Sequence, residues 1–477
     1  MKALLLAGLL AVAGLLSGQL DTIRMASIGG ADANGGLAVV ELGDGDALVV
    51  GYTDSNGWGT RAPWALRLDS MLEVVWQQAL PVEAGGVAVG AVVLPDGAAV
   101  VASRELLDGA NGYGVRWHRL DATTGEVLAT ATWSSEDWVL PHGVSLQGDT
   151  VVTWVTDYSS GTAQPAALMG RWETGEHAFL GQYAWGTEGL TEHMGAGTVA
   201  HGKWWIASTE RPASDSARVR VRAIDANGTV HWSALAPIDA ALVEANALSV
   251  VEEKVVVGMT VDEAGPVPMA KVVRWDTSGT ATPIVIAPGN PAQVRAVRWN
   301  APEMNYLFRT EVFGLGAGDM IFLRQGPLGG FIGAMTFGWE EAEEPEAMMQ
   351  DALGAVWLVG STEHMGANVH VVRAPSDQIG DHTLITSDTL LSTPLSIPAS
   401  PRPAQLAAFP NPASSAVTLS GLPCPLPEAR FTAFALQGTV IATGSADQLD
   451  VSRWPVGTYL IDVQCGTARF ALRLVHS

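Results

Sequence analysis

The chain has 477 residues, of which 48% are hydrophobic and only 16% are charged, and its formal net charge is −23 at pH 7. This length exceeds what one hydrophobic core usually holds, so we expect at least two domains. The composition is too apolar for a disordered chain, and the negative charge would repel phosphate backbones, which argues against nucleic acid as a partner.

The N-terminus has the layout of a secretory signal peptide. Lys2 is followed by an uncharged apolar run, residues 3–16, and then by Ser17, Gly18 and Gln19. The run is shorter than the roughly 20 residues of a membrane-spanning helix, and no cysteine follows it to accept a lipid. We therefore predict that residues 1–18 are removed and that the mature protein is soluble, and either secreted or displayed on the cell surface.

A weak repeat with a period near fifty residues runs from about Leu37 to Leu384. Its clearest copy has alternating segments at 37–42, 47–53, 64–68 and 73–80, which predict four antiparallel strands. An acidic residue follows the second strand in seven copies, 49 to 53 residues apart. This spacing predicts a seven-bladed β-propeller over residues 19–385. The seven acids are Asp54, Glu105, Asp157, Glu210, Asp262, Glu311 and Glu363.

Residues 21–28 have the pattern of one further strand. A ring of blades needs its ends joined, and an open ring would leave an exposed sheet edge. We therefore predict that this segment is the outer strand of the seventh blade.

A second marker lies at the turn between the third and fourth strands, where an acidic residue is often followed by glycine, as in Asp121 and Gly125. An aspartate side chain can bond the turn backbone, and glycine tolerates positive φ, so we assign these turns a structural role. Tryptophans on or near fourth strands, such as Trp76 and Trp185, are predicted to pack between blades, with a sugar platform as the alternative.

These blades resemble the secreted bacterial β-propeller repeats of the quinoprotein-like and delta-sixty type, in segments such as 47–53 and 121–126. The resemblance implies the fold alone, because such propellers serve as enzymes, receptors and scaffolds.

The loops from strand two to three and the blade connectors should emerge on one face, which would carry an acidic rim. Carboxylates suit calcium, and a Glu-His pair suits a transition metal. The alternative is that the acids cap loop backbone and keep the protein soluble. The hexapeptide Thr-Glu-His-Met-Gly-Ala maps to the same face, at 191–196 in a blade connector and at 362–367 in a loop from strand two to three, and His142 maps to the preceding connector. Beyond the seven acids, which include Glu363, the candidate binding residues are Glu192, His193 and His364.

No linear catalytic signature is present, so no catalytic residue is assigned, and calcium is the one candidate cofactor. Propeller enzymes can draw isolated side chains from several blades. Two classes of function therefore stay open: a binding or adhesion module for an unknown glycan or protein, and a secreted hydrolase or lyase acting on polysaccharide. A quinone-dependent oxidoreductase is a weaker third.

Residues 386–407 are rich in Pro, Ser and Thr, which predicts a linker. Beyond it, short strands are predicted at 416–420, 429–436, 439–443, 458–464 and 468–475, separated by Gly and Pro turns. Residues 408–477 are thus predicted to form a small Ig-like β-sandwich.

This last segment resembles the type A C-terminal sorting domain of the type IX secretion system of Bacteroidota. Its motif elements occur in the family's order, although Ala435 stands where Asp is usual and Thr439 where Arg or Lys is common. The resemblance implies passage through an outer-membrane translocon, removal of the domain by a sortase-like peptidase, and attachment to surface lipopolysaccharide or release. Cys424 and Cys465 both lie in this segment and could form a disulfide. The matching residues are Phe409, Pro410, Asn411, Pro412, Gly438, Pro455, Gly457, Tyr459 and Arg473.

Overall fold

The computed structural model divides the chain into two compact units, Met1–Pro394 and Leu395–Ser477. The described residues contain no helix long and apolar enough to span a membrane. The residues that the structure describes are 23–29, 32–43, 45–54, 61–107, 112–135, 138–173, 176–212, 216–238, 240, 242–252, 254–262, 268–276, 278–284, 292–300, 302–311, 318–326, 330–338, 341–363, 368–375, 383–385, 407–409, 416–420, 429–435, 440–445, 449–465 and 468–476.

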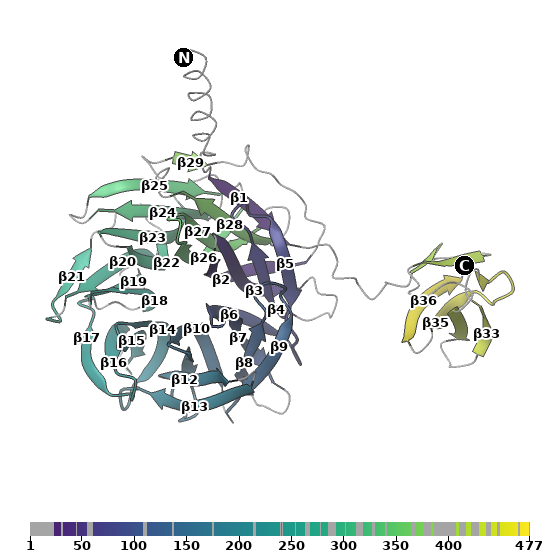
Figure 1. The fold of residues 1–477 in the computed structure, drawn as a ribbon, viewed down its shortest axis with the longest axis horizontal. Coiled ribbons are helices and arrows are strands. Elements are labelled where there is room, and N and C mark those ends of the chain that lie inside the picture. The colour runs from purple at the N-terminus through teal and green to yellow at the C-terminus, as the bar shows by residue number, and fades with distance from the viewer. Residues whose placement is uncertain are drawn as a thin grey trace, which may run out of the picture. The chain divides into compact units, whose positions relative to one another are not determined.

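Within these residues the first unit forms seven antiparallel sheets arranged as a ring, which confirms the predicted seven-bladed β-propeller (Figure 1). Blades one to three are β2 (Asn34–Gly43), β3 (Asp46–Thr53), β4 (Ala62–Leu68) and β5 (Val74–Ala79); β6 (Gly86–Val93), β7 (Ala99–Leu106), β8 (Tyr113–Leu120) and β9 (Val127–Trp133); and β10 (Val139–Gln147), β11 (Thr150–Asp157), β12 (Gln164–Glu173) and β13 (Glu176–Ala184).

Blades four to six continue in chain order around the ring. They are β14 (Thr191–Ala200), β15 (Lys203–Arg211), β16 (Arg218–Ile224) and β17 (Val230–Leu235); β18 (Leu242–Val251), β19 (Lys254–Asp262), β20 (Met269–Trp275) and β21 (Ala281–Ile284); and β22 (Ala292–Asn300), β23 (Glu303–Thr310), β24 (Asp319–Gln325) and β25 (Phe331–Phe337). The first strand of each blade contacts the first strand of the next around the centre of the ring.

The seventh blade joins the two ends of the unit. It consists of β26 (Glu343–Gln350), β27 (Val356–Thr362), β28 (Asn368–Ala374) and β1 (Arg24–Ile28). Strand β1 pairs antiparallel with β28, from Arg24 opposite Arg373 to Ile28 opposite Val369. Met25 and Ile28 are buried in two different core clusters. The N-terminal strand therefore closes the ring, in agreement with the expectation for residues 21–28.

Burial explains why the second and third strands carry continuous apolar runs. Ala47, Leu48, Val49 and Val50 of β3 are each no more than 2% exposed, because neighbouring blades cover both faces of the sheet. Fourth strands lie at the rim of the ring, and β9 alternates between half-buried and exposed residues. The pattern of apolar residues thus changes with distance from the centre.

The turns between the third and fourth strands have the predicted structure. The carboxylate Oδ1 of Asp121 accepts the backbone N–H groups of Thr123 and Thr124 at 2.8 and 3.0 Å, and Gly125 has a φ of 77°. Asp225 and Asp276 likewise accept hydrogen bonds from backbone N–H groups of their own turns.

Tryptophans on or directly after the fourth strands pack onto these turns in the next blade. The indole N–H of Trp76 donates to the carbonyl oxygen of Ala122 at 3.0 Å, and that of Trp185 to the carbonyl oxygen of Gly228 at 2.9 Å. The predicted packing between blades is confirmed for these two side chains.

A further strand extends the sixth blade. Strand β29 (Thr383–Ile385) pairs parallel with β25, with Thr383 opposite Met335. The sequence did not predict this pairing, because three residues are too few to show alternation. The predicted linker, 386–407, lies outside the described residues except for its last residue.

The second unit is a small two-layered sandwich. Its sheets are β30 (Ala407–Phe409), β31 (Ala416–Ser420) and β34 (Leu449–Asp450); and β33 (Val440–Ser445), β32 (Ala429–Ala435), β35 (Gly457–Cys465) and β36 (Ala468–His476). Val417 and Leu449 of the first sheet share one core with Phe431, Ile461 and Val463 of the second. The predicted β-sandwich is therefore confirmed.

Candidate functional site

The seven acids that follow the second strands do not form one open rim. Glu105 and Glu210 are fully buried, and each pairs with an arginine of its own blade's third strand. Arg116 Nε lies 3.0 Å from Glu105 Oε2, and Arg220 Nε pairs with Glu210 Oε1. The expected acidic rim is wrong at these positions, because the charges are buried and neutralised inside the blades.

The remaining acids have mixed surroundings. Asp157 is 5% exposed and accepts the backbone N–H of Ser159 at 2.9 Å, which matches the capping alternative. Asp54 pairs with Arg61 at 3.1 Å and Glu311 with Arg309 at 3.0 Å. Asp262 ends β19, and Glu363 is exposed just after β27. No group of three or more His, Cys, Asp and Glu side chains within the described ranges is placed to hold a metal ion.

The first copy of the hexapeptide begins β14 rather than lying in a connector, and this corrects its predicted position. Glu192 is fully buried and forms a two-pronged ion pair with Arg222, with N–O distances of 2.8 and 3.0 Å. Glu192 is therefore not available on an acidic face. His193 Nδ1 lies 3.2 Å from the hydroxyl of Tyr158. In the second copy, His364 lies outside the described residues.

A buried cluster in the second blade has the residue types of a catalytic triad but not its geometry. Ser103, Glu105 and His118 are all 0% exposed. The same imidazole nitrogen, Nε2 of His118, contacts both the Ser103 hydroxyl at 3.2 Å and the Glu105 carboxylate at 3.1 Å. A triad uses one ring nitrogen for the nucleophile and the other for the carboxylate. This cluster is therefore part of the blade's polar core.

Each described inner strand, the first strand of its blade, carries a β-bulge three or four residues after its start. One extra residue interrupts the pairing with the second strand, and successive extra residues are 49 to 53 positions apart. We call these seven residues the bulge ring. They are Leu37, Val89, His142, Gly195, Asn246, Arg295 and Glu346.

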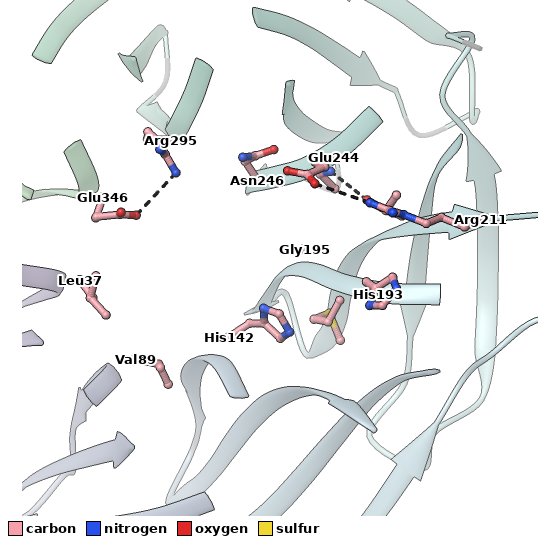
Figure 2. A pocket seen from close by; sticks show the side chains of 13 residues that line it. Leu37, Val89, His142, His193, Gly195, Arg211, Glu244, Asn246, Arg295 and Glu346 are labelled. Carbon is pink, nitrogen blue, oxygen red and sulfur yellow. Dashed lines mark hydrogen bonds and ion pairs between the residues drawn. The ribbon is translucent and has the colours of Figure 1, made fainter. Parts of the chain in front are cut away.

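All seven members of the bulge ring line one pocket of about 580 Å³, the channel pocket (Figure 2). Side chains of a regular strand project from the two faces of its sheet, which here face the neighbouring blades. A bulge re-aims the side chain of its extra residue. The bulges therefore explain how strands whose faces are covered by other blades present side chains at the centre of the ring. His142 lies in β10 and not in a connector, which corrects its predicted place.

Threonines of the second strands hold the bulges in place. The Thr156 hydroxyl accepts the backbone N–H of Met194 at 3.0 Å, and the Thr209 hydroxyl accepts that of Ala245 at 3.1 Å. Met194 and Ala245 directly precede the bulge residues of the next blade. Because a bulge disrupts the regular ladder, these hydroxyls supply partners that the strand pairing does not. Thr156 and Thr209, which precede two of the acidic markers, thus support the backbone of the pocket.

The pocket's arginines face carboxylates. Arg295 Nη2 lies 2.9 Å from Glu344 Oε2, and Arg295 Nη1 lies 4.0 Å from Glu346 Oε2. Arg211 Nη2 lies 3.6 Å from Glu244 Oε1 (Figure 2). Burial raises the pKa of Glu346, with Arg295 opposing and Glu344 adding to the shift. The carboxylate of Glu346 therefore takes up a proton more readily than an ordinary glutamate.

The two histidines of the pocket are neutral at pH 7. Desolvation by the surrounding protein lowers the pKa of His142 to about 4, with Arg104 and His193 acting in the same direction. Burial also lowers the pKa of His193, with Arg211 adding to the shift and Glu244 opposing it.

Sequence reasoning did not find the bulge ring as a set, although a signal was present. The residue after each bulge is glycine or alanine in all seven blades. A Cβ on Gly90 would lie 2.9 Å from Val144 Cγ1 and 3.1 Å from Val144 N, whereas one on Gly143 would meet nothing within 4 Å, so close approach of the inner strands accounts for the small residue at Gly90 but not at Gly143. The small residues are Ala38, Gly90, Gly143, Ala196, Ala247, Ala296 and Ala347.

No family model matches the sequence, and no curated protein matches it. Among solved structures, the Pan2 WD40 domain of Neurospora crassa is 11% identical, with a TM-score of 0.47 over 72% of this chain and 89% of that one. Polysaccharide lyase Uly1 is 11% identical, with a TM-score of 0.48 over 76% and 93%. An α-L-arabinanase of Penicillium chrysogenum, complexed with arabinobiose, is 9% identical, with a TM-score of 0.39 over 61% and 93%. At these values no activity follows for this chain.

Proposed function

We propose that the chain is an exported protein that binds an extracellular ligand in the channel pocket of its propeller. The observation that carries this proposal is the convergence of one bulge residue from each blade on a single cavity. A volume of about 580 Å³ falls within the range of small-molecule sites. Repeating the same backbone irregularity in every blade is costly for a sheet, and bulges are frequent beside binding and active sites.

The export part of the proposal rests on the signal-peptide layout and on the sorting-domain resemblance. Several motif residues of the second unit meet in one place. The Tyr459 hydroxyl donates to the Pro455 carbonyl, and the Trp454 ring packs on the Tyr459 ring with 4.9 Å between centroids. Gly457 begins β35, and Arg473 pairs opposite Leu460. Tyr459 is buried, so these contacts stabilise the unit, and its recognition by a translocon and by a sortase-like peptidase rests on the sorting-domain resemblance.

Other elements of the sorting-domain resemblance stay predictions. Phe409 ends β30, whereas Pro410, Asn411, Pro412 and Gly438 lie outside the described residues. Cys465 ends β35, but Cys424 also lies outside them, so the disulfide remains a prediction. Attachment to surface lipopolysaccharide, or release, would follow removal of the domain.

Deleting residues 408–477 should leave the propeller in the periplasm of a host that has the secretion system. The expected result is loss of the protein from the surface and the medium, measured by protease accessibility of intact cells and by fractionation. As a control, a variant with Val440→Ala, which changes an exposed side chain of β33 that is not among the motif residues, should still be exported. Surface display of the truncated chain would contradict the proposed role of the second unit.

A hydrolase or lyase is the second candidate, and one observation favours it. Glu346 has a raised pKa in a pocket that also contains the carboxylate of Glu244. A carboxyl with a raised pKa that shares a pocket with a second carboxylate is the residue set of many glycoside hydrolases.

A screen of the mature chain against soluble polysaccharides, oligosaccharides, peptides and small metabolites separates the two candidates. We expect saturable binding to at least one class, measured by calorimetry, without new reducing ends or unsaturated products. Turnover that disappears in Glu346→Gln would instead establish the enzyme. The absence of binding to every class, by a chain that unfolds cooperatively on heating, would contradict the proposed function.

A further inference from the structure

From the chemistry of the bulge ring we infer that the channel pocket takes a neutral saccharide unit and that the ring residues determine its specificity. This inference rests on the proposed binding function and adds to it the class of ligand and the residues that select it. It depends on three properties of the pocket: its charges are paired, its lining is divided into an apolar and a polar side, and it offers uncharged hydrogen-bonding groups.

The paired charges disfavour an ionic ligand. Each arginine of the lining faces a carboxylate, Arg211 with Glu244 and Arg295 with Glu344 and Glu346. An anion would have to replace one of these carboxylates, and a cation would have to replace an arginine. A neutral ligand can bond the outer N–H groups and carboxylate oxygens without separating the pairs. A paired guanidinium and carboxylate can donate a hydrogen bond to one hydroxyl of a ligand and accept a hydrogen bond from the adjacent hydroxyl.

The lining has two sides. Leu37 and Val89 come from adjacent blades and lie on one side of the cavity, whereas Asn246 and Arg295 lie on the other (Figure 2). A sugar ring has the same division, because its C–H groups form apolar faces and its hydroxyls point outward. An apolar metabolite would leave the polar side without partners, which is costly for buried groups. A fully polar ligand would gain nothing from Leu37 and Val89.

Uncharged groups are available for hydrogen bonds. Asn246 of β18 lines the pocket, and its amide carries both a hydrogen-bond donor and an acceptor. Thr156 accepts the N–H of Met194, and its hydroxyl lies 2.8 Å from His142 Nε2. If Thr156 donates its proton to Nε2, the Nδ1–H of His142 is left to donate to a ligand hydroxyl. Asn246 and His142 then offer an amide group and an N–H donor from different blades.

Two ring variants test the inference with the full mature chain. On a glycan array with neutral, uronic-acid and sulfated oligosaccharides, we expect binding to neutral members. Asn246→Ala should weaken the affinity for a neutral member about tenfold, because it removes hydrogen bonds to a ligand hydroxyl. Leu37→Ala should weaken it by a similar factor, because it removes apolar contact. Calorimetry measures both affinities.

Leu128→Ala is the matched control for Leu37→Ala, since Leu128 is 46% exposed on the fourth strand β9. This variant should bind as the unchanged chain does, and all variants should keep its melting temperature. If both ring variants bind a neutral glycan as tightly as the unchanged chain does, the bulge ring does not determine specificity. The proposed binding function would still stand. Binding restricted to acidic glycans would overturn the neutral class. If no glycan binds, the saccharide inference fails, and binding of a peptide or metabolite in the wider screen would still support the proposed function.

Discussion

Removing residues 19–30 from the mature chain should lower the melting temperature of the propeller by roughly 10 °C or more, or leave it unfolded. The deletion takes away β1, all five of its pairings with β28, and two buried side chains, Met25 and Ile28. Burying side chains of this size contributes about 1.5–3 kcal/mol each. The loss also uncovers β28 as a sheet edge. Tryptophan fluorescence can follow unfolding of the propeller, because Trp454 is the one tryptophan of 17 that lies in the second unit.

A point substitution gives the same test without exposing an edge. Ile28→Ala should cost about 2–5 kcal/mol, because Ile28 is 3% exposed and packs in the cluster shared by blades one and seven. Leu128→Ala removes a comparable side chain from an exposed position and should change the melting temperature little. An unchanged melting temperature after both the deletion and Ile28→Ala would show that β1 does not close the ring.

Replacing Glu192 by Gln should destabilise the propeller by about 3–5 kcal/mol, because it leaves the charge of Arg222 buried without its partner. Glu192 is 0% and Arg222 5% exposed, and the carboxylate also accepts the N–H of Thr187 at 2.6 Å. The double variant Glu192→Gln and Arg222→Met removes both charges and should be more stable than Glu192→Gln alone. If the double variant loses as much stability as Glu192→Gln, or more, this account is contradicted. Denaturant unfolding followed by fluorescence measures all three chains.

The same pair should contribute to acid unfolding. Burial alone would raise the pKa of Glu192, but hydrogen bonds from Arg222 and Thr187 outweigh it and hold the pKa below the ordinary value of 4.5. A carboxyl with a lowered folded pKa contributes stability that is complete above its unfolded pKa and is lost as the pH falls through the folded value. The stability difference between the unchanged chain and Glu192→Gln should therefore shrink as the pH falls below about 4.5.

Regular spacing made the blades predictable from the sequence. The second strands read as short apolar runs because both faces are covered, and the acid that ends each run sets the period. The sandwich strands Ala416–Ser420 and Ala429–Ala435 lie within one residue of their predicted bounds. Strands β30 and β34 were missed because three and two residues are too short to alternate.

Interactions between strands limited the prediction of the site. Glu105 and Glu210 read as surface acids, because nothing along the chain indicates that Arg116 and Arg220 lie beside them. The bulge residues share no chemical type, so no motif marks them. What they share is a backbone geometry and the small residue that follows, and these become informative only when the blades are aligned around a ring.

The bulges also assign core packing and ligand contact to different residues, whereas most binding sites combine the two. In each blade, the residues that build the core lie on the faces of the sheet, while one extra residue faces the centre and takes no part in strand pairing. Leu37, His142, Asn246 and Arg295 differ in size and polarity, and of the four only Arg295 is charged, yet the same blade architecture carries all of them. A propeller of this kind can therefore acquire a new ligand by single substitutions at separate blades, with little effect on its folding.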